Sequence, residues 1–452
     1  MRSFDVVVVG AGPAGEVAAG RLAENGLKVA IVEDRLVGGE CSFWACMPSK
    51  ALLRPYEALA EARRIPGAAE AVTGRLDVAA VLARRDEIIH DLDDDAQPPW
   101  LQEREIELIR GHGRLSGERR VAVNGDEIEA TRAVILATGS LPAIPPIAGL
   151  DGIDGAWTNR DATTAKEIPD RLAILGGGVV GVEMAQAFQS LGSQVTLIEG
   201  ARRLIPNEEE FACVELTEAL RELGVDIRTA QKAEAIEQDG DGTVTVKTTD
   251  GGSAVADKVL LALGRRPSTK DLGLETVGLE PGELIHVDAH NRVPSHEWLY
   301  AIGDINGKAL FTHMGKYQAR ISADHVLGHA HALSHGADGP LSPRVIFTEP
   351  QVAAVGHTTE TAEKAGLIVD TYRTSTSGNA GGSFYGRNAA GSTQWVVDRE
   401  RRIVVGCTIT GAEVADFLHA ATIAIVGEVP LERLRHAVPS FPTRSEIWLQ
   451  LE

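Results

Sequence analysis

The segment FDVVVVGAGPAGEVAAGRLAENGLKVAIVE, residues 4–33, has the pattern of a strand, a glycine loop, a helix and a second strand. Apolar residues fill Phe4–Val9 and Lys28–Val32, and a helical pattern between them runs to about Asn25. In the loop, Gly10, Gly12 and Gly15 allow a tight turn, a close approach to pyrophosphate and helix-on-strand packing. Amide groups at the helix start can bind phosphate, and Glu33 can accept from a ribose hydroxyl. The segment therefore predicts a dinucleotide site.

The same unit recurs in the middle of the chain. Leu172–Leu175 and Gln194–Ile198 predict strands, and Val182–Leu191 predicts the helix between them. The second glycine loop and its acid are Gly176, Gly178, Gly181 and Glu199. Glu33 and Glu199 each lie 18 residues beyond the last glycine of their loop. Two intact nucleotide sites predict an α/β chain with two Rossmann-like domains, although a duplicated fold with one working site would show the same pattern.

Two cysteines lie just beyond the first unit. Cys41 and Cys46 stand five positions apart in Gly38-Gly39-Glu40-Cys41-Ser42-Phe43-Trp44-Ala45-Cys46-Met47-Pro48-Ser49-Lys50. Pro48 suits the early positions of a helix, and Lys50 brings a cation close in sequence, both of which favour a thiolate. Inert buried cysteines or half of a metal site are the alternatives, but metal pairs are usually closer and come with further ligands. We interpret the pair as a redox-active disulfide.

Composition narrows the class of protein. A chain of 452 residues suggests three domains at about 150 residues each. The net charge of -20 would repel nucleic acids and anionic membranes, so we expect neither as a partner. Four cysteines exclude a disulfide-stapled scaffold, and Cys213 and Cys407 fit a hydrophobic core. Phe4–Val9 is too short to cross a membrane and lacks signal-peptide features, so we expect a cytoplasmic protein.

The order of the sites suggests which cofactor each binds. A flavin can take a hydride and pass electrons to sulfur, whereas a nicotinamide transfers only hydride. Because the cysteine pair follows the first site, we assign FAD to that site and NAD(P)H to the second. Glu199 would repel a 2'-phosphate and favours NADH, although Arg202 and Arg203 could hold the phosphate of NADPH.

Together these motifs resemble the FAD-dependent pyridine nucleotide–disulfide oxidoreductases, the group of dihydrolipoamide dehydrogenase, glutathione reductase and mercuric reductase. Five more segments carry the resemblance in the family's order: Ala137-Thr138-Gly139, Leu263-Gly264-Arg265-Arg266-Pro267, Tyr300-Ala301-Ile302-Gly303-Asp304, Phe311-Thr312-His313-Met314 and Pro343-Arg344-Val345-Ile346-Phe347-Thr348-Glu349-Pro350. The resemblance implies an FAD-binding domain (1–142 and 270–341), an inserted NAD(P)-binding domain (143–269) and an α+β dimerisation domain (342–452). It also implies a homodimer whose active site is shared between subunits.

The resemblance assigns roles to single residues. Cys46 would form the charge-transfer pair with the flavin, and Cys41 would exchange with substrate. Lys50 would lie beside the flavin, with Glu183 as its ionic partner. Further cofactor contacts would come from Thr138, Gly139, Gly264, Gly303, Asp304 (the ribityl chain) and His313, at whose helix N-terminus amides would face the flavin's pyrimidine carbonyl.

The C-terminus departs from the family pattern. Disulfide-reducing members carry His-Pro-Thr-x-x-Glu, where this chain reads Phe441-Pro442-Thr443-Arg444-Ser445-Glu446. Glu446 keeps its spacing, but Phe441 replaces the general base, a loss that typically costs about a hundredfold or more. His436 could substitute if the chain bends back. Phe43 and Trp44, between the cysteines, would either narrow access to Cys41, present a flat surface to substrate, or pack beneath the flavin.

These observations predict an enzyme that passes electrons from NADH through FAD to the Cys41–Cys46 disulfide. A disulfide, a quinone or another small electrophile would be the acceptor. Mercuric reduction is disfavoured because the last five residues, 448–452, contain no cysteine pair. Two alternatives stay open: a ketone-forming carboxylase of the same family, which also has phenylalanine at the base position, and a non-catalytic redox sensor.

Overall fold

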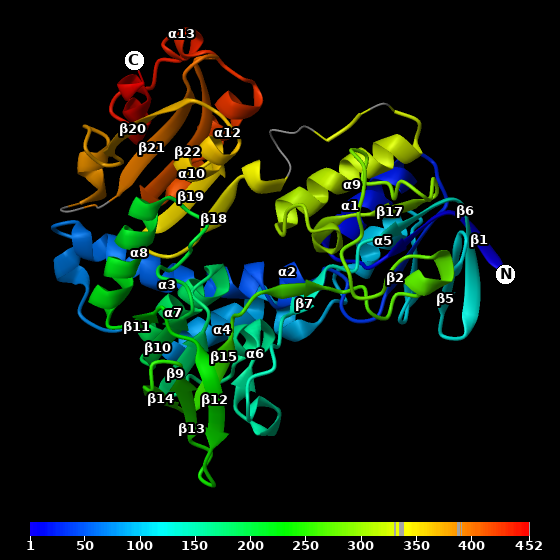
Figure 1. Cartoon of the computed structure of the whole chain (residues 1–452), viewed down its shortest axis with the longest axis horizontal. Helices are drawn as coiled ribbons and strands as arrows, with labels where there is room; N and C mark the ends of the chain where they lie inside the picture. The colour runs from blue at the N-terminus through cyan, green and yellow to red at the C-terminus, as the bar shows by residue number, and fades with distance from the viewer. Residues whose placement is uncertain (330, 334–338, 387–388, 390, 452) are drawn as a thin grey trace. The chain divides into compact units, whose positions relative to one another are not determined.

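The computed structural model describes residues 1–329, 331–333, 339–386, 389 and 391–451 (Figure 1). The end of the expected dimerisation domain, residue 452, lies outside the described residues. The chain divides into two compact units, each assembled from three segments. Unit 1 comprises Met1–Pro48, Asp86–Pro142 and Arg265–Pro340, and unit 2 comprises Ser49–Arg85, Ala143–Gly264 and Leu341–Glu452.

A seven-stranded sheet forms the centre of unit 1, in the order β3-β2-β1-β6-β5-β4 with β17 also paired to β6. The strands β3, β2, β1, β6 and β17 run parallel, whereas β5 and β4 are antiparallel additions at one edge. Parallel strands are covered on both faces, which explains the unbroken valine run of β1. The strands are β1 (Arg2–Val9), β2 (Val29–Glu33), β3 (Glu107–Arg110), β4 (Arg114–Gly117), β5 (Arg120–Val123), β6 (Asp126–Leu136) and β17 (Leu299–Ala301).

Helices α1 and α9 lie side by side in unit 1 (Figure 1). Alanines of both helices, including Ala18 and Ala319, enter one hydrophobic cluster with Val6 and Val8 of the sheet. The close packing uses Gly315, where an added Cβ would lie 3.2 Å from Ala14. The remaining elements of the unit include α1 (Pro13–Glu24), α2 (Gly39–Phe43), α5 (Pro98–Glu103), α9 (Thr312–Val326) and the two-stranded sheet of β7 (Ser140–Pro142) and β16 (Arg265–Pro267), while α3 (Cys46–Arg64) and α4 (Val78–Ile88) each belong to both units.

Unit 2 contains a second parallel sheet, in the order β11-β10-β9-β15-β8. Helices α7 and α8 pack on it through a cluster that includes Phe188, Leu197 and Leu216. A three-stranded antiparallel sheet, β12-β13-β14, adjoins it. The elements are α6 (Asn159–Thr164), α7 (Val179–Ser190), α8 (Glu210–Leu223), β8 (Ala156–Trp157), β9 (Arg171–Leu175), β10 (Gln194–Glu199), β11 (Asp226–Thr229), β12 (Ala233–Gln238), β13 (Val244–Thr248), β14 (Ser253–Ala256) and β15 (Lys258–Leu261).

The C-terminal part of unit 2 is a five-stranded antiparallel sheet, in the order β18-β19-β22-β21-β20. Trp395 is fully buried in its core, which also contains Leu418 and Ile447 from the helices and turns that follow. The elements are β18 (Arg344–Ile346), β19 (Gln351–Gly356), β20 (Val369–Ser375), β21 (Ser392–Asp398), β22 (Ile403–Gly411), α10 (Thr359–Lys364), α11 (Val414–Phe417), α12 (His419–Val426) and α13 (Leu431–Leu434).

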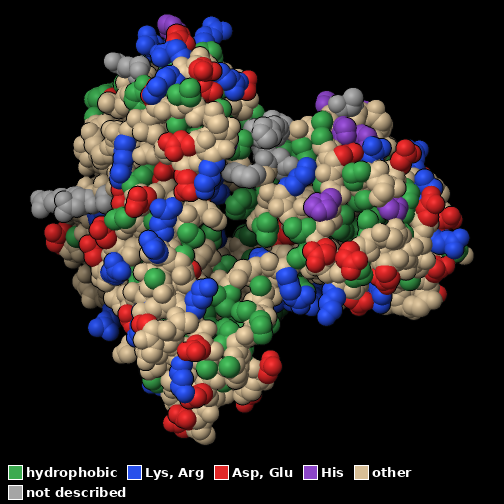
Figure 2. All heavy atoms as spheres, in the orientation of Figure 1, with side chains coloured by type: hydrophobic (Ala, Val, Ile, Leu, Met, Phe, Trp, Pro, Cys, Tyr) green, Lys and Arg blue, Asp and Glu red, His purple; other side chains and the backbone are tan. Residues whose placement is uncertain are grey.

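The α/β fold class expected from the sequence is confirmed, with two parallel sheets and an α+β C-terminal part. Within the described ranges, no helix has the length and apolar character needed to cross a membrane. Acidic and basic side chains are interspersed over the face drawn in Figure 2, so the net charge of -20 is not gathered into one acidic patch on that face.

Candidate active site

The first glycine loop joins β1 to α1. Gly10 has a φ of +103°, and its amide donates to the carbonyl of Val32 at 2.8 Å. A Cβ on Gly15 would lie 1.9 Å from the carbonyl oxygen of Gly10, so only glycine permits this turn. Gly12 is the N-cap of α1, and no described side chain caps its amides. The helix start therefore presents backbone donors of the kind that hold a phosphate.

Glu33 closes this loop from the end of β2. One carboxylate oxygen accepts from the amide of Ala11 at 2.7 Å, and the other accepts from the amide of Arg35 at 2.9 Å. Burial raises the pKa of the Glu33 carboxyl, and these two hydrogen bonds oppose the rise. Each carboxylate oxygen has a second lone pair, so Glu33 can hold the loop and still accept from a ribose hydroxyl.

The second loop, between β9 and α7, reproduces this geometry in unit 2. Gly176 has a φ of +105°, and a Cβ on Gly181 would lie 1.8 Å from the carbonyl oxygen of Gly176. Glu199 accepts from the amides of Gly177 at 2.5 Å and Ala201 at 2.6 Å, as Glu33 does at the equivalent positions. Gly178 is the N-cap of α7, again with no described side chain as a cap. Both loops thus fit the pyrophosphate of a dinucleotide.

Cys41 and Cys46 lie together in unit 1 in the dithiol form. Cys41 is in α2, and Cys46 is the first residue of α3. A hydrogen bond that the Cys41 thiol donates to Cys46, together with burial, raises the pKa of the Cys41 thiol. The hydroxyl of Thr312, the first residue of α9, lies 3.4 Å from the sulfur of Cys46 and also hydrogen-bonds Cys41. One hydroxyl therefore contacts both sulfurs.

Cys46 and burial raise the pKa of the Cys41 thiol, and the charge of Lys316, an exposed residue that the sequence did not single out, opposes part of that rise. Lys316 lies one helical turn beyond Thr312, and positions i and i+4 share a helix face. Thr312 and Cys46 are 266 positions apart in the chain, so sequence spacing could not reveal this contact. The signal in the sequence was that Thr312 and Lys316 lie 8 and 12 positions after Asp304, the end of a segment that resembles the family.

Lys50 and Glu183 form an ion pair within unit 2. The ammonium group lies 3.0 and 2.8 Å from the two carboxylate oxygens and 4.6 Å from the centre of the Phe347 ring. Glu183, on α7, also accepts from the amide of Phe347 at 2.9 Å. The side chain of Glu183 is only 4% exposed, against 34% for Lys50. The cation and the amide donor offset the cost of removing this carboxylate from water.

Asp304 takes part in a polar network of unit 1. It follows Gly303, whose φ is +76° and whose amide donates to Gln318 at 2.8 Å. Its carboxylate accepts from the hydroxyl of Ser140 at 2.5 Å, and Arg265 donates to the same hydroxyl oxygen at 2.6 Å. The second oxygen of Asp304 is not used in that bond, so the residue can also accept from a ribityl hydroxyl.

Four other predicted cofactor contacts lie near the unit boundaries or on α9. Thr138 donates to the carbonyl of Ser268 at 2.9 Å, and Gly139 and Gly264 both have positive φ, +68° and +109°. His313 is exposed on the first turn of α9, and its ring stacks on that of Phe311 with centres 5.4 Å apart. In the loop between the cysteines, Phe43 is buried, at 2% exposed.

The C-terminal segment keeps the acid but not the base of the family motif. Phe441 is 76% exposed, so its ring makes little contact within the chain. One carboxylate oxygen of Glu446 is buried and finds no hydrogen-bond partner among the described residues. Arg444 donates to the carbonyl of Ala412 and stacks on Tyr385 at 3.8 Å, which anchors the segment. The chain therefore keeps the acid of the motif, with one oxygen that has no described partner, while Phe441 stands at the position of the family's histidine.

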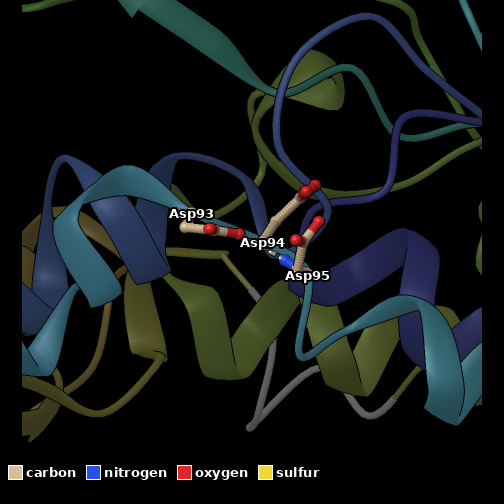
Figure 3. Close-up of side chains that lie close together, drawn as sticks. All are labelled: Asp93, Asp94 and Asp95. Atoms are coloured by element: carbon tan, nitrogen blue, oxygen red, sulfur yellow. Dashed lines mark hydrogen bonds between the residues drawn. The ribbon is translucent and has the colours of Figure 1, made fainter.

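Asp93, Asp94 and Asp95 follow one another in a single loop of unit 1 (Figure 3). They form the one group of acidic, histidine or cysteine residues with metal-like spacing within the described ranges. Asp94 already accepts from the amide of Val37 at 2.6 Å and from Arg110 at 2.7 Å. These bonds explain the cluster as an anchor for the loop before α2.

Two dinucleotide loops and a thiol pair define an oxidoreductase that couples a nucleotide to thiol chemistry. The family model described as pyridine nucleotide-disulphide oxidoreductase matches residues 4–327, and that family's dimerisation domain matches residues 342–451. The chain belongs to the pyridine nucleotide-disulphide oxidoreductase family. Its cofactors are those of the family, FAD and NAD(P)H, as expected from the sequence.

Relatives that are named for different activities match the chain over almost its full length. It is 34% identical to a dihydrolipoyl dehydrogenase of Thermus scotoductus over 99% of this chain and 96% of the relative. It is 30% identical to a mercuric reductase of Staphylococcus aureus over 98% of this chain and 81% of the relative. LpdA from Mycobacterium tuberculosis, a solved structure, has a TM-score of 0.87 at 25% identity and covers 100% of this chain and 99% of its own.

Proposed function

We propose that the protein passes electrons from NADH through FAD to the Cys41–Cys46 disulfide and on to a small acceptor. The observation that carries the proposal is the contact of Cys41 with Cys46, with Thr312 bridging both sulfurs, in the unit that contains the first glycine loop. Family membership supports the cofactors but leaves the acceptor unassigned.

Bound FAD would supply hydride acceptance from NADH and an electron pair for sulfur. The Cys41–Cys46 bond takes that pair and becomes one thiolate and one thiol, the proton being the one carried by the hydride. The thiolate of Cys41 then attacks an acceptor disulfide, and one acceptor sulfur leaves as a thiolate. Attack by Cys46 on the mixed disulfide restores the Cys41–Cys46 bond and releases the second acceptor thiolate. One proton from the enzyme and one from solvent complete the two product thiols.

The remaining polar residues would hold this arrangement in place. We assign Lys50 to the position beside the flavin on the strength of the family resemblance, with Glu183 fixing its ammonium group. Gly10, Gly12, Gly15 and Glu33 would hold FAD, and Gly176, Gly178, Gly181 and Glu199 would hold the nicotinamide nucleotide. The carboxylate of Glu199 favours NADH over NADPH.

Phe441 determines which acceptors are efficient. A phenyl ring cannot take or return the proton that thiol–disulfide exchange requires, so reduction of dithiols such as lipoamide should be slow. A quinone or similar small electrophile, which takes electrons from flavin directly, needs no such base. Lys50 and Glu446 argue against the ketone-forming carboxylase, because that branch lacks the lysine and has a second histidine at the position of Glu446.

We further propose that the chain acts as a homodimer with an active site shared between subunits. The match to the family's dimerisation domain over residues 342–451 supports this assembly. The same proposal includes three domains. The FAD-binding domain comprises residues 1–142 and 270–341, the NAD(P)-binding domain 143–269 and the dimerisation domain 342–452.

Counting thiols tests the proposal. Oxidised holoenzyme is mixed anaerobically with NADH, labelled with iodoacetamide and analysed by mass spectrometry. One equivalent of NADH should expose Cys41 and Cys46 to label, while Cys213 and Cys407, both buried, should stay unlabelled in folded protein. Steady-state assays with disulfides and quinones then identify the acceptor. Equal labelling of Cys41 and Cys46 with and without NADH would refute the proposed route.

A further inference from the structure

Helix α9 places a positive charge beside the cysteine pair. Thr312, its first residue, contacts both sulfurs, and Lys316 follows one turn later on the same face. The ammonium group of Lys316 acts electrostatically on Cys41. Lys50 has a carboxylate partner of its own, because its ammonium group donates to both oxygens of Glu183 and, at 3.3 Å, to the hydroxyl of Ser49. Lys316 is thus the cation that the structure associates with the exchange thiol.

The same lysine acts electrostatically on a carboxyl group of the neighbouring helix. Glu16 is the residue after Gly15 in the first turn of α1, and α1 packs against α9 through Ala14 and Gly315 (Figure 1). Burial raises the pKa of Glu16 to about 7, the charge of Lys316 opposes the rise, and the nearby carboxylate of Glu33 adds to it. Glu16 therefore changes its charge near neutral pH.

The glycine loop itself does not require this carboxyl group. In the second loop the equivalent position, directly after Gly181, is the buried residue Val182. Glu16 and Val182 donate the same backbone hydrogen bond, to Gly12 and Gly178 respectively, each at 3.0 Å. Because an apolar side chain serves the same turn, the acid at position 16 needs another explanation.

We propose that Lys316 stabilises the thiolate of Cys41 during disulfide exchange, and that Glu16 weakens this effect by competing for the same ammonium group. The inference rests on the proposed function, in which Cys41 attacks the acceptor. The step is the transfer of the Cys41 proton to water, which leaves a thiolate beside the ammonium group of Lys316. No electrons move in it, and Lys316 keeps its own protons. A fixed charge of this kind partly compensates for the base that Phe441 replaces.

The charge of Glu16 determines the direction in which the effect of Lys316 on Cys41 changes with pH. Below pH 7 its carboxyl is neutral, so the charge of Lys316 acts on Cys41 alone. Above pH 7 Glu16 becomes a carboxylate and neutralises part of that charge, so the thiolate gains less from Lys316. The groups that act on Cys41 are Cys46 from α3 and Thr312 and Lys316 from α9, and those that act on Glu16 are Lys316 and Glu33 from β2.

The test measures the rate at which iodoacetamide alkylates Cys41 in NADH-reduced holoenzyme, between pH 6 and 9, by mass spectrometry. Only the thiolate reacts, so the rate at each pH reports its fraction. The variants are Lys316→Met, Lys316→Arg and Glu16→Gln. The matched control is Arg320→Met, which removes an exposed cation one turn further along α9.

A nearby opposite charge typically lowers a pKa by about one unit or more. Lys316→Met should therefore slow alkylation about three- to tenfold at pH 7.5, whereas Lys316→Arg and Arg320→Met should stay within about twofold of the unchanged protein. Glu16→Gln should raise the rate about twofold at pH 8.5 and leave it unchanged at pH 6. The inference is overturned if Lys316→Met and Arg320→Met give equal alkylation rates. It is also overturned if Glu16→Gln changes the alkylation rate by the same factor at pH 6 and pH 8.5.

Two controls separate this inference from its premises. The visible spectrum of bound flavin shows whether each variant is folded and has bound FAD. If Lys316→Met fails that check, the inference is tested by whether the effect of Glu16→Gln on alkylation depends on pH. If NADH does not expose Cys41 in the unchanged protein, the proposed function fails. The same alkylation series on protein reduced with dithiothreitol then still tests Lys316 and Glu16.

Discussion

Removing the charge of Lys50 should destabilise unit 2, because the carboxylate of Glu183 would then be buried without a cation. The pair has two short contacts, 3.0 and 2.8 Å, and Glu183 is almost inaccessible. Breaking a fully buried pair costs about 3–5 kcal/mol. Since a third of the Lys50 side chain is exposed, solvent screens part of the interaction, and we expect about 2 kcal/mol for Lys50→Met.

A double-mutant cycle separates the pair from its surroundings. Glu183→Leu removes the buried charge but also the acceptor of the Phe347 amide, so it should cost about 1–2 kcal/mol on its own. The double variant Lys50→Met/Glu183→Leu should be less destabilised than the sum of the single variants, with a coupling energy of about 1–2 kcal/mol. The assay is urea unfolding followed by circular dichroism, with the slope of each transition compared before midpoints are converted.

The matched control is the Lys364–Glu360 pair on α10, which is exposed at both ends. The same cycle there should give a far smaller coupling, because water screens exposed charges. If the Lys50–Glu183 cycle couples no more strongly than this surface pair, the buried pair does not hold Lys50, and the positioning role proposed for Glu183 is wrong.

Two further variants test the acceptor and the nucleotide. Phe441→His restores the base of the family motif, whose acid is kept as Glu446, and steady-state reduction of a small disulfide should rise at least tenfold. An unchanged rate would point to the loop around Trp44 instead. Glu199→Gln removes the carboxylate, but the glutamine oxygen can still accept from one of the two backbone amides that Glu199 binds. The ratio of kcat/KM for NADH to kcat/KM for NADPH should fall about tenfold. A constant ratio would show that Glu199 does not set the nucleotide preference.

Local patterns in the sequence predicted the two nucleotide loops well, because their geometry is set by short-range sterics. The strand expected at Lys28–Val32 is β2, Val29–Glu33, and the helix expected at Val182–Leu191 is α7, Val179–Ser190. Both helices begin within the glycine loop, at Pro13 and Val179, since the last glycine already lies in the first turn. Cys213 and Cys407 are buried, which confirms their expected place in the core.

The polar contacts around the cysteines could not be predicted in the same way. The contact of Thr312 with Cys46 depends on how α9 packs against α1, and no local pattern encodes that packing. The sequence suggested Lys50 as the cation for the thiols, because it is close along the chain. In the structure Lys50 pairs with Glu183, and Lys316 acts electrostatically on Cys41. Sequence spacing could not reveal Lys316, because 275 positions separate it from Cys41 in the chain.

The most direct test of electron transfer to sulfur is an anaerobic titration of the holoenzyme with NADH, followed by visible absorbance. The unchanged protein should develop a long-wavelength band from a thiolate beside the flavin, Cys41→Ser should retain such a band, and Cys46→Ser should lose it. If the flavin of the unchanged protein bleaches completely with no such band, or if Cys46→Ser gives the same band, the cysteine pair does not receive the electrons.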